Sequence, residues 1–162
     1  MSLLLSTADR AVSAYISQNG TSIPVYPLKR SGDKALPCVI VNCHRATPIN
    51  PFDPTCNIDC TVYVRTVGPA DVDQSDTDPV DESDRIVALV DSAFRRFGDD
   101  EQSGESLANG ITSAAAAAGI ANFTCLSAEL LSYETNTDAP HDGDAWTDAI
   151  TLRLTANLVA GG

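Results

Sequence analysis

The stretch NIDCTVYVRTV, residues 57–67, alternates apolar and polar side chains along most of its length. Ile58, Cys60, Val62 and Val64 fall on one side of it. Because neighbouring side chains of a β-strand point to opposite faces, this pattern predicts a strand with one face in a core and the other in water. A sheet built from such strands is covered on one side, so the rest of the chain must supply the cover.

Three further stretches predict strands. Residues 37–44 have a β-branched centre, and residues 123–134 and 145–158 predict an antiparallel pair. One face of the last stretch is apolar: Trp146, Ile150, Leu152, Leu154 and Leu158. Residues 45–55 contain three prolines, which lack the amide hydrogen that a ladder needs, and they are therefore predicted to form a loop.

Helical periodicity supplies the cover for this sheet. Residues 79–97 carry apolar side chains at helical spacing, namely Ile86, Leu89, Val90, Ala93, Phe94 and Phe97. Pro79 suits the first turn and Gly98 the end of this helix. Residues 4–18 and 106–118 predict two more helices. We therefore expect an α+β fold, a mainly antiparallel sheet with two to three helices packed on one face, as a single domain over residues 1–162.

Residues 23–28, IPVYPL, predict an edge strand, because each of its two prolines removes an amide donor. Its apolar side chains Ile23, Val25, Tyr26 and Leu28 form a candidate subunit interface. An apolar edge is either covered or paired. A neighbouring subunit would do this through a contact that can close into a ring, and a loop of the same chain is an equal alternative.

The chain is strongly acidic, with a net charge of −12. Its ten basic residues form no stripe, so it is expected to repel nucleic acid rather than bind phosphates. Residues 69–84 predict an acidic loop whose end begins the helix, with seven carboxylates at Asp71, Asp73, Asp76, Asp78, Asp81, Glu82 and Asp84. A solvated surface explains this composition, and the lining of a channel that DNA passes without sticking is a second interpretation.

Metal chemistry is a weak alternative. Cys38, Cys43, Cys56 and Cys60 with His44 are soft ligands, but their spacing is unlike zinc knuckles, and Cys56 and Cys60 would lie about 13 Å apart on an extended strand. The sequence therefore predicts that these cysteines and Cys125 are buried free thiols. Residues 71–82 resemble an EF-hand loop only in part, because Asp76 stands where glycine is required. We expect no cofactor and no metal site, with a divalent-metal-binding module as an alternative.

No enzyme is expected. Nucleophilic catalysis needs a base beside the nucleophile, and His44 adjoins Cys43 on a strand, where adjacent side chains point to opposite faces. His141 lies in a predicted loop, residues 135–144. No apolar run is long enough to span a membrane, and MSLLLSTADR lacks the basic region of a signal peptide.

The order of elements resembles that of the tail terminator (tail-completion) proteins of long-tailed bacteriophages. The segments that carry this resemblance are LPCVIVNC, CTVYVRT, DESDRIVALVDSAFRRF and AWTDAITLRLTANL. The resemblance covers nearly the whole chain and implies a structural virion protein of the neck, assembled in the host cytoplasm, and no catalytic site. It implies a homo-oligomeric ring, usually a hexamer, that caps the tail tube, stops its growth and docks the head connector or stopper protein. DNA passes through such rings without tight binding, and their lumens are often acidic; we place Asp71, Asp73, Asp76 and Asp78 there. Another neck protein, such as a tail-to-head joining, stopper or connector protein, is the alternative.

Overall fold

The computed structural model of the protein describes residues 2–19, 23–28, 37–67, 79–95, 103–135 and 145–158. Within these ranges the fold contains three helices and one five-stranded sheet, which confirms the predicted α+β class. The elements follow one another as α1 (Ser2–Asn19), β1 (Val25–Pro27), β2 (Cys38–Pro48), β3 (Cys56–Val67), α2 (Pro79–Phe94), α3 (Ser103–Ala117), β4 (Phe123–Glu134) and β5 (Ala145–Leu158).

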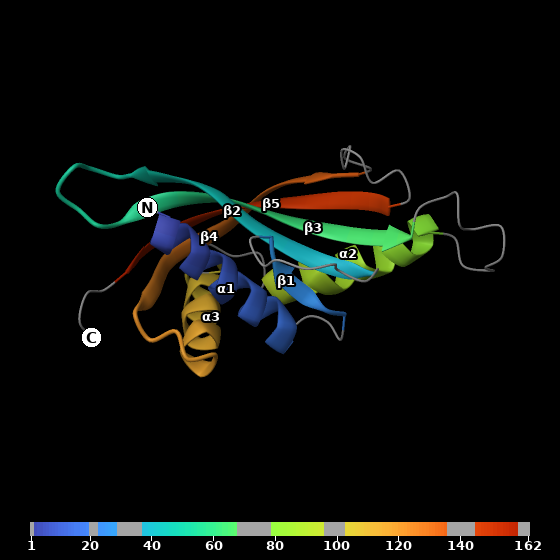
Figure 1. Ribbon diagram of the computed structural model, residues 1–162, viewed down its shortest axis with the longest axis horizontal. Helices are drawn as coiled ribbons and strands as arrows, with labels where there is room; N and C mark the ends of the chain where they lie inside the picture. The colour runs from blue at the N-terminus through green and yellow to red at the C-terminus, as the bar shows by residue number, and fades with distance from the viewer. Residues whose placement is uncertain are drawn as a thin grey trace.

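The sheet has the strand order β1-β2-β3-β5-β4. All its neighbouring strands are antiparallel except β1, which runs parallel to β2. The β4–β5 pair has the bounds that the sequence predicted, and β5 lies between β3 and β4. Strands β2 and β3 form a long hairpin whose turn extends past the helices at the left of Figure 1.

One face of the sheet is buried. Ile58, Cys60, Val62 and Val64 of β3 are all inaccessible to solvent, as their alternation predicted. One core cluster contains side chains from this face and from all three helices, and Figure 1 shows the helices below the sheet in its view. In β5 the predicted apolar face supplies Ile150, Leu152 and Leu154 to this core.

Helix α1 places Ala8, Val12, Tyr15 and Ile16 in the core at the predicted helical spacing. Its Tyr15 hydroxyl donates a hydrogen bond to the Ala93 carbonyl of α2 at 2.5 Å. The Tyr15 and Phe94 rings stack with their centroids 6.2 Å apart. These contacts tie the two helices together, although their residues are far apart in the sequence.

The predicted ends of β2 and α2 are wrong. Strand β2 continues through residues 45–48, which were predicted to be a loop, and Pro48 pairs with Cys56. A proline at the end of a ladder costs little, because only one edge of the residue needs a partner there. Helix α2 ends at Phe94 rather than at residue 97, and Arg95 lies in a turn; Phe97 lies outside the described residues.

The predicted core face of α2 needs one correction. Ile86, Val90 and Phe94 are buried as expected, but the side chain of Leu89 is 36% exposed. Successive residues are about 100° apart around a helix, so Leu89 sits well to the side of Val90. In its place the small side chains of Ser83 and Ala93 complete the buried face.

Helix α3 begins at Ser103, earlier than predicted, and ends as predicted before Gly119. Gly119 has a φ of 87°, a conformation in which a Cβ is strained. The Ile120 amide donates to the Ala115 carbonyl at 2.8 Å, and the Gly119 amide donates to the Ala116 carbonyl at 3.0 Å. This is the Schellman type of helix end, and it turns the chain directly into β4.

Among the described residues, no helix combines the length and the apolar character needed to cross a membrane.

Candidate assembly surfaces

The strand β1 is an edge strand of the sheet, as expected. Of the predicted edge residues, Val25 and Tyr26 lie on β1, and Ile23 and Leu28 flank it. Ile23 and Val25 are partly buried and pack against the core of their own chain. Tyr26 is half-buried, and Leu28 is 44% exposed. The chain therefore covers much of this edge itself, and Leu28 is the predicted interface residue that projects most into solvent.

The backbone of β1 offers little to a further strand. The Leu28 amide donates to the Val41 carbonyl at 2.8 Å, and the Pro24 carbonyl accepts from the Val39 amide at 2.9 Å. Bonding residues alternate along a ladder, so the backbone of Val25 and Pro27 faces the free edge. Proline has no amide hydrogen, which leaves Val25 as the donor of β1 on that side.

The opposite edge, β4, is also protected. Its register shifts between Cys125 and Ser127 and again between Leu130 and Ser132. Thr112 of α3 caps the first irregularity, because its hydroxyl accepts from the Cys125 amide at 3.0 Å and lies 3.3 Å from the Cys125 carbonyl. Bulges and capped backbone groups are devices that discourage strand addition.

The turn of the β2–β3 hairpin exposes apolar side chains that the sequence analysis did not single out. Phe52 is 97% exposed and Ile49 is 51% exposed.

Within residues 46–58, which include this turn, Asp53 is the only charged side chain. The tip is therefore an apolar, nearly uncharged projection on a chain whose net charge is −12. Apolar side chains held in water in this way are typical of a contact surface.

Hydrogen bonds hold the tip in one shape. The Phe52 amide donates to Asn50 Oδ1 at 3.0 Å, and the Thr55 amide donates to Asp53 Oδ1 at 2.9 Å. The Ile49 amide closes the turn on the Thr55 carbonyl at 3.2 Å. The Thr55 amide and hydroxyl lower the pKa of Asp53 from its usual value. Because the tip is already ordered, a partner would lose little conformational entropy in binding it.

The four predicted channel residues, Asp71, Asp73, Asp76 and Asp78, lie outside the described residues, as do the EF-hand-like ligands up to residue 77 and His141. At the other end of the acidic stretch, residues 79–84 belong to α2, where Asp84 is exposed. The structure therefore describes where this stretch ends and leaves the channel interpretation a prediction.

All five cysteines are free and buried, which confirms the prediction made for them. Cys43 is buried while the neighbouring His44 is exposed, so these two side chains do point to opposite faces. His44 Nε2 instead lies 3.4 Å from the Thr61 hydroxyl. Within the described ranges, no group of three or more His, Cys, Asp or Glu residues is arranged to hold a metal ion.

Asp9 is a buried carboxylate that the sequence analysis missed. It lies on the core face of α1, and its Oδ1 accepts the Cys43 amide at 2.5 Å. The register of β2 against β3 shifts between Cys43 and Arg45, so this amide belongs to a bulge. The position of Asp9 among Ala8, Ala11 and Val12 was the available signal, because a charge on an apolar helix face needs a buried partner.

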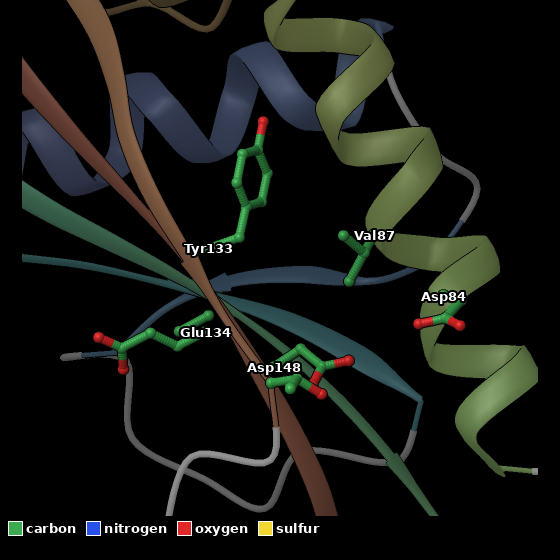
Figure 2. Close-up of a pocket in the computed structure, with 7 residues that line it drawn as sticks. Asp84, Val87, Tyr133, Glu134 and Asp148 are labelled. Carbon is green, nitrogen blue, oxygen red and sulfur yellow. The ribbon is translucent and has the colours of Figure 1, made fainter.

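A cavity of about 250 Å³ lies between α2 and the ends of β4 and β5. Figure 2 shows Asp84 and Val87 on the helix, across from Tyr133 and Asp148 on the strands. Asp148 is buried and accepts a hydrogen bond from the Ser83 hydroxyl. The lining is acidic, because three of its side chains are the carboxylates Asp84, Glu134 and Asp148.

Beside this cavity, Asp91, Arg95 and Tyr133 form a cluster that joins α2 to β4. Arg95 Nε donates to Asp91 Oδ1 at 2.9 Å, and the Arg95 guanidinium donates to the Tyr133 hydroxyl at 3.0 Å. The Tyr133 hydroxyl in turn donates to Asp91. The hydrogen bond with Tyr133, followed by that with Asp91, raises the pKa of Arg95 above its usual value.

No protein-family model matches this chain, and no curated protein matches it.

Proposed function

We propose that this protein is a structural component of a bacteriophage neck, the tail terminator that forms a ring on the end of the tail tube. The resemblance of the quoted segments to that family supports the viral role. The acidic composition, with a net charge of −12, fits a passage that DNA crosses without sticking. The nearest alternative is another neck protein, such as a stopper, which would share these properties.

The observation that carries the assembly role is the hairpin tip. Phe52 is almost fully exposed, yet two side-chain-to-backbone hydrogen bonds fix the turn that presents it. A protruding apolar side chain that docks elsewhere on a neighbouring copy makes a heterologous contact, and such contacts close into rings when the rotation permits.

Both sheet edges favour this kind of contact over strand addition. Pro27 removes a donor from the free side of β1, and Thr112 caps part of β4. Subunits would therefore meet through packed side chains, with Phe52 and the exposed Leu28 as contact residues.

The test is ring formation by the purified protein. Light scattering across concentration and salt, with negative-stain images in the presence of tail tubes, should reveal rings of about six subunits on tube ends. Phe52→Ser should weaken each subunit contact about 10- to 100-fold, because burying a phenylalanine contributes roughly 1.5–3 kcal/mol.

Leu131→Ser is the matched control, since Leu131 is also exposed but lies on β4. It should leave the rings intact. A wild-type protein that stays monomeric and binds no tube would contradict the tail-terminator role, and rings unaffected by Phe52→Ser would contradict the role of the tip.

A further inference from the structure

We propose that Cys43 and Cys60 form an oxidisable dithiol, which closes to an intramolecular disulfide at the base of the β2–β3 hairpin. The two residues are direct partners in the antiparallel register of β2 and β3. Both side chains are buried in the core, and Cys60 raises the pKa of the Cys43 thiol. The proposal does not depend on the assembly role proposed above.

The backbone geometry suits the bond. Directly opposite residues of antiparallel strands have Cα atoms about 4.5–5.5 Å apart, which falls within the roughly 4.4–6.8 Å range of disulfides. The other three cysteines have no cysteine opposite them. Cys38 pairs with Arg65, Cys56 with Pro48 and Ala156, and Cys125 with Ala156.

The pair lies where the hairpin leaves the helices. Asp9 of α1 holds the Cys43 amide, and from His44 onward most β2 side chains are exposed. A bond between Cys43 and Cys60 would close a loop that contains the tip with Phe52. Oxidation would therefore clamp the base of the projecting hairpin and leave its tip unchanged.

The chemistry balances with a diazene oxidant such as diamide. One thiolate adds to the N=N bond and forms an S–N bond. The second thiol then attacks this sulfur, so that the S–S bond forms, the S–N bond breaks and the hydrazine leaves. The two thiol hydrogens and two electrons pass to the oxidant. The hydrogen bond with Cys60, burial and the charge of Asp9 raise the pKa of Cys43, so thiolate is scarce in the closed fold and reaction requires transient opening.

The experiment compares three full-length proteins after diamide treatment, by intact mass and by maleimide labelling of the remaining thiols. Wild type and Cys38→Ala/Cys56→Ala/Cys125→Ala should each lose two hydrogens without forming dimers. Cys43→Ala, which keeps the other four thiols, should not lose these two hydrogens. The melting temperature of the oxidised proteins should rise by about 5 °C and return on reduction.

A second measurement covers the case in which the triple variant fails to fold. Cleavage of oxidised Cys38→Ala before Asp53 and Asp59 separates Cys56 from Cys60, so mapping identifies the bonded pair. A bond from Cys43 to Cys60 supports the proposal. Wild type that stays reduced, including near its melting temperature, or Cys43→Ala that oxidises at the wild-type rate, would overturn it.

Discussion

Replacing Thr112 with valine tests how this fold protects its long edge strand. The Thr112 hydroxyl accepts the Cys125 amide at 3.0 Å and lies 3.0 Å from the Ala108 carbonyl and 3.3 Å from the Cys125 carbonyl. Valine keeps the shape of threonine but removes the hydroxyl. The Cys125 amide, in a residue that is almost fully buried, then loses this acceptor.

The expected cost follows from these bonds. A net hydrogen bond contributes about 0.5–1.5 kcal/mol, and a buried donor left unsatisfied costs roughly 1–3 kcal/mol. Thr112 is itself half-buried, so water can replace part of the loss. We expect a decrease in the free energy of unfolding of about 1–2 kcal/mol, which lowers the melting temperature of a chain of this size by roughly 2–8 °C.

Urea unfolding and amide hydrogen exchange provide the assay. Thr112→Val should speed exchange of the Cys125 amide, whereas Thr112→Ser should retain most of the protection because it keeps the hydroxyl. Ser113→Ala, at an exposed neighbouring position, controls for general effects on α3. If Thr112→Val has wild-type stability and unchanged exchange of the Cys125 amide, the assignment of Thr112 as the cap of this edge is refuted.

Three other outcomes are expected. Tyr15→Phe should lower the free energy of unfolding by about 1 kcal/mol in urea titrations, since the buried Ala93 carbonyl loses its hydroxyl donor; no change would argue against this bond. The lowered pKa of Asp53 means that its contacts with Thr55 are present above the usual Asp range and are lost as pH falls through the lowered pKa. The NMR signal of the Thr55 amide should therefore shift as Asp53 is protonated. A Thr55 amide signal that does not follow this titration would contradict the contact between the two residues. Lysine at the four predicted channel positions should impair DNA passage and leave folding intact, and unchanged infectivity would disprove the channel role of Asp71, Asp73, Asp76 and Asp78.

Local patterns in the sequence were sufficient to predict most elements. The apolar faces predicted for β3, β5 and α1 supply residues to the core, and β4 and β5 form the predicted antiparallel pair. These patterns work because burial on one side of a strand or helix imposes a period that needs no knowledge of the partner. The end of α3 at Gly119 was equally local, since a left-handed residue there favours glycine.

Pairing between segments that are distant in the sequence explains the features that local patterns did not predict. Strand β2 runs through to Pro48 because β3 supplies partners there, and Cys43 meets Cys60 only through that register. Asp9 is tolerated in the core because a bulge on a distant strand presents an amide to it. The exposure of Phe52 likewise depends on where the hairpin ends relative to the helices. The sequence by itself therefore determined most elements and their buried faces, because those follow from local periodicity. The tertiary structure alone decided which backbone groups and thiols meet and which apolar side chains remain exposed, because those depend on contacts between distant segments.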